Sequence, residues 1–198
     1  YIPTFKDIYG FKPKNKVFLD KSSKKLCGKF RKGHFEGVLN VVNRFIEIIK
    51  PRYIFLGKKD YQQLFLIKKH IKKNFNIKVF SCKTIRDKNK VALSSRNNLL
   101  NKNDLKKSSY IANLLFDLRN KLKSNSSFKY EIKNIIRQIN NLKNIKIEYL
   151  EIRNKKNLSK KYNRNNHAFE ILAVAGGYQI RSKSECSMGI PRRYSARQ

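Results

Sequence analysis

The sequence predicts an α/β protein, with a parallel sheet that has helices outside it, followed by a small α+β domain. Short, continuously apolar runs such as YIFLG (53–57) have the length of buried parallel strands, and they alternate with segments of helical periodicity. After residue 97 the pattern changes to two amphipathic helices followed by two strands. The alternation therefore predicts right-handed βαβ units in the first part of the chain only.

Before residue 97, the predicted order is helix, strand, helix, strand. Residues 34–49 predict an amphipathic helix that Pro51 ends, because their apolar positions recur at helical spacing. The strand at 53–57 leads into a second helix, and residues 77–82 predict the next strand. The expected core stripes are Val38, Val41, Val42, Phe45 and Ile49 in the first helix, and Leu64, Ile67, Ile71 and Phe75 in the second.

Beyond residue 97, Asn101 is expected to cap a helix that has Asp104 in its first turn. A break rich in Ser and Asn at 124–127 is expected to end this helix, and a second helix follows. Strands are predicted at 145–152 and 168–175. The apolar faces expected for the two helices are Ile111, Leu114, Leu115, Leu118 and Leu122, and then Ile132, Ile135, Ile136 and Ile139.

The domain boundary is predicted near residue 98, which gives domains 1–97 and 98–176. From Gly176 onward the cations are four Arg and one Lys, and Asn disappears, so residues 177–198 are expected to be a divergent, disordered tail. The sequence opens at Tyr1, and its only Met is Met188. We therefore expect it to be part of a longer protein.

The net charge is +34, from 47 Lys+Arg against 13 Asp+Glu. Such a charge raises nucleic acid, anionic membranes and anionic small molecules as partners. However, 34 of the 47 cations are Lys, spread along the whole chain, and Asn and Ile are also abundant, which is typical of A/T-rich codon usage. Nucleic acid is therefore not the expected partner, although a basic nucleic-acid-binding module stays open as the alternative.

The cysteines Cys27, Cys82 and Cys186 lie far apart, with no C-x-x-C pair and no His at ligand spacing. They predict neither a disulfide framework nor a metal site. No apolar run approaches the roughly 20 residues that a membrane span needs. A soluble, cytoplasmic protein is expected.

Two polar clusters follow apolar segments where a ligand site is expected. In GKKDYQQL (57–64), Gly57 allows close approach to the backbone, Lys59 offers charge to a phosphate, and Asp60 can accept from ribose hydroxyls. Gln63 lies one helical turn after Asp60. In ALSSRN (92–97), two hydroxyls precede Arg96, whose planar fork suits phosphate. Taken alone, each cluster is also compatible with a solvated turn.

Four segments, in this order and spacing, resemble one family: KFRKGHFEGVLNVV (29–42), IFLGKKDYQQLFLI (54–67), TIRD (84–87) and ALSSRNNLL (92–100). From about residue 1 to about 175 the chain resembles the pantothenate synthetases, ATP-dependent pantoate to β-alanine ligases of the nucleotidyltransferase superfamily. The resemblance implies that 1–97 is the C-terminal part of a Rossmann-like ATP- and pantoate-binding domain and that 98–176 is a lid. It also implies ATP with Mg²⁺, the substrates pantoate and β-alanine, and a homodimer at full length.

The resemblance further implies a two-step reaction, in which a pantoyl-adenylate forms with release of pyrophosphate and β-alanine then displaces AMP. Lys59 and Arg96 are expected to be catalytic, by neutralising charge on the phosphates. Gln63 is expected to hold pantoate, and no metal ligand is expected among the side chains. His34 either faces the pocket or caps the helix that it begins. The implied ATP-binding residues are Gly57, Lys58, Lys59, Asp60, Ile85, Leu93, Ser94, Ser95 and Arg96.

The sequence also departs from the family. It has neither the His-x-Gly-His segment nor the early Gln that helps to bind pantoate, so we expect the chain by itself to be inactive. Lys58 stands where the family usually has Glu. Lys90 stands at a customary Gly, where the backbone normally tolerates a positive φ, so this position is expected to be strained or reshaped. Another nucleotidyltransferase with a different acid substrate is a further alternative. All these expectations require the loops around residues 57 and 94 to converge on one triphosphate.

Overall fold

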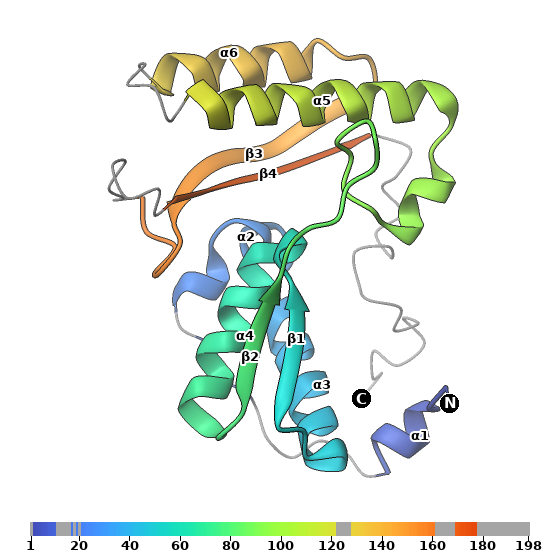
Figure 1. Cartoon of the computed structure of the whole chain (residues 1–198), viewed down its shortest axis with the longest axis vertical. Coiled ribbons are helices and arrows are strands. Elements are labelled where there is room, and N and C mark those ends of the chain that lie inside the picture. Colours follow the sequence, from blue (N-terminus) through green and yellow to red (C-terminus); the bar gives the residue numbers. More distant parts are fainter. Residues whose placement is uncertain are drawn as a thin grey trace. The chain divides into compact units, whose positions relative to one another are not determined.

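The structure is a computed structural model that describes residues 2–10, 17, 19, 21–121, 128–160 and 169–177. The chain divides into two compact units, Tyr1–Thr84 and Ile85–Gln198 (Figure 1). The first contains a parallel strand pair with helices, and the second contains an antiparallel pair with helices. The predicted fold class is therefore confirmed. The predicted tail beyond residue 177 lies outside the described residues.

In the first unit, β1 and β2 pair in parallel, with Tyr53 opposite Lys78 and Gly57 opposite Cys82. Their carboxyl ends therefore meet at one edge of the sheet. Helix α3 begins at His34 and ends at Ile49, as predicted, just before Pro51. The elements in order are α1 (Phe5–Ile8), η1 (Lys21–Lys24), α2 (Cys27–Phe30), α3 (His34–Ile49), β1 (Tyr53–Gly57), η2 (Lys58–Asp60), α4 (Tyr61–Asn74) and β2 (Lys78–Cys82).

The core of the first unit forms where α3 and α4 pack on one face of this sheet. The stripe predicted for α4 is confirmed, since Leu64, Ile67 and Ile71 are buried. The stripe predicted for α3 is confirmed in part: Val38 is buried and Val42 packs against the core cluster, but Phe45 and Ile49 are exposed. Phe35, Leu39 and Ile46, outside the predicted stripe, are buried. The apolar face of this helix is wider than the strip that meets the core, so periodicity alone did not determine which part of it is buried.

The other face of the β1–β2 sheet differs from the prediction of a strand buried on both sides. Tyr53, Phe55 and Phe80 are exposed there. The rings of Phe55 and Phe80 stack with their centroids 5.1 Å apart. Successive strand residues point to opposite faces, so Ile54, Leu56 and Val79 pack against the core cluster while the aromatic residues lie on the opposite face.

A buried glutamine connects α4 to the segment that precedes α3. The side chain of Gln62 is 4% exposed, and its Nε2 donates to the carbonyls of Ser22 (3.1 Å) and Lys25 (2.7 Å). Its Oε1 accepts from the backbone N–H of Cys27 (3.0 Å). These three bonds satisfy main-chain groups in a stretch without long regular structure. Gln62 therefore fixes η1 and α2 against α4.

A histidine and two asparagines join α3 to α4. His70 Nε2 lies 2.7 Å from Asn43 Oδ1 on α3, and His70 Nδ1 lies 3.2 Å from Asn74 Nδ2. With both asparagines oriented in this way, the imidazole is neutral, donating through Nε2 and accepting through Nδ1. Burial, and then the charge of Lys73, lower the pKa of His70.

In the second unit, two helices pack on an antiparallel strand pair (Figure 1). The backbone N–H of Asp104 donates to Asn101 Oδ1 (2.8 Å), which confirms the predicted cap. The predicted break at 124–127 lies outside the described residues. The elements in order are η3 (Ser95–Leu99), α5 (Lys102–Lys121), α6 (Phe128–Asn140), β3 (Ile145–Asn154) and β4 (Phe169–Gly177), and β3 pairs with β4 along its whole length.

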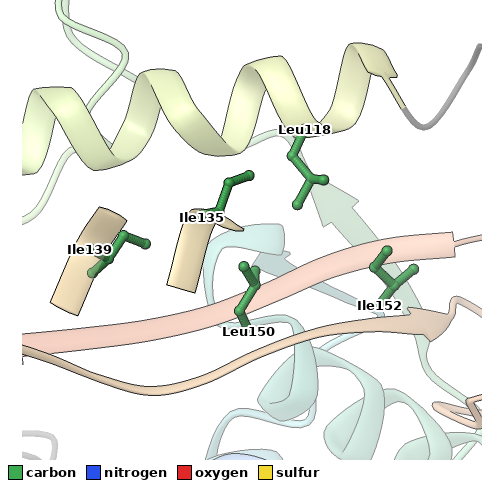
Figure 2. Packing of buried hydrophobic residues seen from close by; sticks show 5 residues of the cluster. All are labelled: Leu118, Ile135, Ile139, Leu150 and Ile152. Carbon is green, nitrogen blue, oxygen red and sulfur yellow. The ribbon is translucent and has the colours of Figure 1, made fainter. Parts of the chain in front are cut away.

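The core of this unit is aliphatic. Figure 2 shows side chains from both helices and from β3 directed toward one another, and all of them are at most 6% exposed. The predicted faces of the two helices are confirmed, since Ile111, Leu114 and Leu115 pack against this cluster from α5. Leu122, predicted to extend that face, lies outside the described residues. The five fully buried members are Leu118, Ile135, Ile139, Leu150 and Ile152.

The two compact units divide after Thr84, rather than near residue 98 where the domain boundary is predicted. Residues 85–97 belong to the second unit because they contact α5: Ser109 Oγ donates to the carbonyl of Asn89 (3.2 Å), and Arg86 lies over the ring of Phe116. The assignment of separate binding and lid domains stays a prediction.

Replacement of Gln62 by Ala is expected to lower the free energy of unfolding by about 3 kcal/mol, because two carbonyls and one N–H lose their buried partner. Urea unfolding of both proteins measures the difference. Gln63→Ala is the matched control: its side chain has no hydrogen bond to another described residue, and a loss below about 1 kcal/mol is expected. Equal losses in the two variants would contradict the role of Gln62.

Acidification is expected to weaken the contact between α3 and α4. The pKa of His70 is lower in the folded state, so the unfolded state binds more protons at mildly acidic pH. The stabilisation from the neutral ring is present above the unfolded pKa of about 6.5 and is lost as the pH falls through the folded value. Unfolding free energies from pH 7.5 to 5 should fall less steeply for His70→Gln, in which His34 is the remaining histidine of the described residues that contributes in this way. Parallel pH profiles would refute this role.

Candidate functional site

The predicted site residues fall into two groups, one in each compact unit. His34, residues 57–60 and Gln63 belong to the first unit, and Ile85 and residues 93–96 belong to the second. The geometry of each group is defined within its own unit. Their convergence around one triphosphate stays a prediction.

Residues 57–60 lie where β1 ends and α4 begins. Gly57 is the last residue of β1, Lys58–Asp60 form η2, and Tyr61 begins α4. The parallel pairing places Cys82, the last residue of β2, beside Gly57. This turn therefore lies at the carboxyl edge of the sheet, which is where open α/β sheets bind their ligands.

The space beside Gly57 is open. A Cβ atom added at this residue would meet no other atom within 4 Å. The backbone is extended (φ −72°, ψ 140°), a conformation open to any residue. A tight turn therefore does not explain the glycine. The arrangement does leave room for a ligand to approach the main chain closely.

Three exposed charged residues, Lys58, Lys59 and Asp60, follow this glycine. Asp60 is the N-cap residue of α4, but its side chain makes no capping hydrogen bond. An aspartate at this position usually accepts from the helix N–H groups. Within the described part of the chain, the Asp60 carboxylate is therefore available to accept from ligand hydroxyls.

The two adjacent glutamines of α4 have different surroundings. Gln62 is buried and fully used in holding the segment before α3. Gln63 is half-buried, and its amide has no hydrogen bond within the described part of the chain. Of the two, Gln63 therefore has the amide available for a substrate, and its predicted contact with pantoate stays a prediction. The structural role of Gln62 was not predicted, because its partners lie 35 to 40 residues earlier in the sequence, in a segment that has no helical or strand-like hydrophobic pattern.

His34 is the first residue of α3, and Gly33 is the N-cap, with φ of +75° and no side-chain capping bond. His34 therefore does not cap the helix. Burial is the main cause that lowers the pKa of His34, and the neighbouring Arg31 lowers it further. The charges of Asp60 and Glu36 act in the opposite direction.

In the second unit, residues 85–93 form a small hairpin, in which Arg86 and Ala92 form a β-bridge. The N–H of Leu93 donates to the carbonyl of Ile85 (3.0 Å), so these two residues lie side by side. Their side chains are 70% and 53% exposed. Two adjacent exposed aliphatic groups suit the flat face of a base, which would remove them from water.

The serines and Arg96 follow this hairpin directly. Ser94 is the N-cap of η3, and its Oγ accepts from the N–H of Arg96 (3.3 Å). The hydroxyl hydrogen of Ser94 is still available to donate. Ser95 and Arg96 are exposed. Two hydroxyls and one guanidinium are thus held together on a single short turn.

Lys90, at the tip of the hairpin, has a φ of +65°. The backbone therefore keeps the positive φ that the customary glycine would allow and is not reshaped. The Asp87 carboxylate stabilises the turn around it, because its Oδ1 accepts from the N–H groups of Asn89 and Val91, both at 2.9 Å. This local network holds a non-glycine residue in the left-handed region.

Within the described ranges, no three His, Cys, Asp or Glu side chains lie close enough together to hold a metal ion. In the same part of the chain, no helix has both the length and the apolar character that a membrane crossing requires.

Comparisons with known proteins identify relatives of nearly the whole chain. The family model described as pantoate-beta-alanine ligase matches residues 1–181. A pantothenate synthetase of Flavobacterium psychrophilum is 35% identical over 178 residues, which is 88% of this chain and 63% of the relative. The chain thus spans somewhat less than two thirds of that protein.

Two solved structures are also similar. The pantothenate synthetase of Thermus thermophilus has a TM-score of 0.73 and is 26% identical in sequence. The match covers 79% of this chain and 58% of the Thermus chain. The pantoate-beta-alanine ligase of Francisella tularensis, complexed with beta-gamma ATP and beta-alanine, has a TM-score of 0.65 and is 30% identical in sequence. The match covers 88% of this chain and 58% of the Francisella chain. By the match of the family model to most of its length, this chain belongs to the pantoate-beta-alanine ligase family.

Proposed function

We propose that this chain carries nucleotide- and pantoate-binding residues of an ATP-dependent ligase that joins (R)-pantoate to β-alanine. The observation that supports this best is the open turn at the end of β1, where an unobstructed glycine precedes Lys59 and Asp60. The Francisella relative is described as a complex with an ATP compound and β-alanine, which agrees with this choice of ligands.

The proposed reaction has two displacements. A carboxylate oxygen of pantoate attacks the α-phosphorus of ATP, and the bond from that phosphorus to the bridging oxygen of pyrophosphate breaks. The amine of β-alanine then attacks the acyl carbon of the pantoyl-adenylate. The bond from this carbon to the phosphate oxygen breaks, AMP leaves, and the amine releases a proton to water.

Neither step needs a nucleophilic side chain. The requirement is to hold the reactants and to balance the negative charge that develops on the phosphates. Lys59 supplies a compact positive charge, and Arg96 supplies a planar pair of donors. The hydroxyls of Ser94 and Ser95 add neutral donors beside Arg96. These four residues would bind the phosphates.

The other predicted residues would bind the flanking groups. Asp60 would accept from ribose hydroxyls, and Gly57 would let the nucleotide approach the main chain. Ile85 and Leu93 would cover one face of the adenine. Gln63 would donate from its amide to pantoate. Lys58 would add positive charge near ATP, and His34 would lie at the margin of the same pocket.

Mg²⁺ would enter with the triphosphate, which supplies the oxygen ligands that this ion prefers. We place the reaction in the cytoplasm, with a homodimer as the assembly at full length. The 198 residues contain no His-x-Gly-His segment, and we propose that they do not turn over by themselves. Two alternatives compete with this proposal. In one, the chain belongs to a nucleotidyltransferase that uses an acid other than pantoate; in the other, it is a basic module that binds nucleic acid rather than ATP.

Gly57→Ala is expected to lower affinity for a non-hydrolysable ATP analogue at least tenfold while leaving the fold intact. The backbone conformation suits alanine and the added methyl contacts nothing, so the thermal unfolding midpoint should not fall. Calorimetric titration measures the affinity. Repeating it against single-stranded DNA at two salt concentrations tests the basic-module alternative, in which steeply salt-dependent DNA binding would replace nucleotide binding. Unchanged affinity for the analogue would argue against close approach at Gly57.

Lys59→Ala and Arg96→Ala are each expected to slow formation of the adenylate by about a hundredfold, or about 3 kcal/mol of transition-state stabilisation. The measurement is a rapid-quench assay of pantoyl-adenylate, made in a form of the protein that turns over. Lys72→Ala, an equal charge change at an exposed position in the last turn of α4, serves as the control and is expected to have a much smaller effect. Normal rates in both test variants would refute their assignment.

A further inference from the structure

Helix α5 has a second face that the hydrophobic core does not use. The core side is formed by Ile111, Leu114, Leu115 and Leu118. Ser109, Ala112 and Phe116 follow one another at spacings of three and four, so they share a different face. Ala112 is buried although it is not part of the core cluster. Another segment must therefore cover this face.

The hairpin of residues 85–93 contacts this second face at both ends. Ser109 Oγ donates to the carbonyl of Asn89 (3.2 Å). Roughly two turns along the helix, the ring of Phe116 carries two cations: the guanidinium carbon of Arg86 lies 5.2 Å from its centroid, and Lys90 Nζ lies 5.4 Å from it. In Figure 1, this loop lies beside α5.

The same contacts hold the hairpin itself together. Arg86 Nη1 donates to the carbonyl of Lys90 (2.9 Å), so the two residues above the ring are also bonded to each other. A backbone hydrogen bond also links the two sides of the hairpin, because the N–H of Asp87 donates to the carbonyl of Val91 (2.9 Å). The ring, the two cations and the turn thus form one connected structure. Phe116 is the member that ties this structure to a long helix.

This structure supports the residues proposed to bind ATP. Ile85 is adjacent to Arg86, and Leu93 is bonded to Ile85 through its N–H. Ser94, Ser95 and Arg96 follow Leu93 without a break. A rotation of the hairpin on α5 would therefore move the apolar pair and the phosphate-binding turn together. The side chain that resists such a rotation is Phe116.

We propose that Phe116, assisted by Ser109, is a positioning residue that locks the nucleotide-binding hairpin onto α5 through a shared cation–π contact with Arg86 and Lys90. The proposal rests on the proposed function for its nucleotide. A cation over an aromatic face is attracted by the negative charge of the ring's π-system. Two of them on one ring favour the hairpin orientation that keeps both contacts. A leucine of similar apolarity would pack but would not attract either cation.

The experiment compares Phe116→Leu with Phe116→Tyr, which keeps the aromatic face, and with Tyr130→Leu as a matched control on α6. Tyr130 is exposed, on a different helix of the same unit. Amide hydrogen exchange is followed at Val91 and Leu93, whose N–H groups are both hydrogen-bonded in the hairpin. Titration with a non-hydrolysable ATP analogue is the second measurement, and urea unfolding checks global stability.

Phe116→Leu is expected to lower protection at Leu93 and affinity for the analogue by on the order of tenfold each, with the global unfolding midpoint little changed. Phe116→Tyr and Tyr130→Leu should match the unaltered protein. Lys90→Gln, which removes one of the two cations without touching the core, should give an intermediate loss of protection. It also keeps the test decisive if Phe116→Leu does not fold.

Unchanged protection at Leu93 in both Phe116→Leu and Lys90→Gln would overturn the positioning role. A loss of protection with unaltered affinity for the analogue would also overturn it, because the hairpin would then be anchored without serving the nucleotide. If the unaltered protein binds no analogue, the proposed function fails instead. Hydrogen exchange alone would then decide whether Phe116 anchors the hairpin.

Discussion

Burial of one face of a two-stranded sheet beneath helices is the constraint on which the structure of each unit depends. In the first unit, Ile54, Leu56 and Val79 supply that face, and α3 and α4 cover it. In the second, Leu150 and Ile152 of β3 pack with residues of α5 and α6. Alternate residues of each strand point into the core, and this fixes which strand residues pair and where the following turn begins. The end of β1 is therefore positioned by the core.

The helices and strands were predictable where a strong local signal acts alone. Pro51 and the periodicity before it located α3, and the apolar run from Tyr53 to Gly57 located β1. The buried side of α3 was not predictable, because Val41 and Phe45 are as apolar as Leu39 and Ile46. Local sequence determines that a helix forms. The neighbours that it meets determine which of its sides is buried.

The candidate site shows the same distinction. The motif indicated Gly57, Asp60 and Gln63, and the structure gives each of them an available backbone, carboxylate or amide. The family resemblance marked Lys90 as an unusual backbone position, and the Asp87 carboxylate that supports its positive φ belongs to the same short stretch. Gln62 and Phe116 were missed. Their partners lie on other segments, so no spacing along the chain encodes these contacts.

The adjacent glutamines of α4 have a consequence for how this stretch can vary. Successive residues on a helix point about 100° apart, so Gln62 and Gln63 face different surroundings despite their identical chemistry. The phase of both amides is fixed by Leu64, Ile67 and Ile71, which the same helix buries. A shift of α4 by one residue would move Gln62 away from its three partners and would also move these three side chains out of the core. Natural variants should preserve the count of residues between β1 and the first buried leucine of α4.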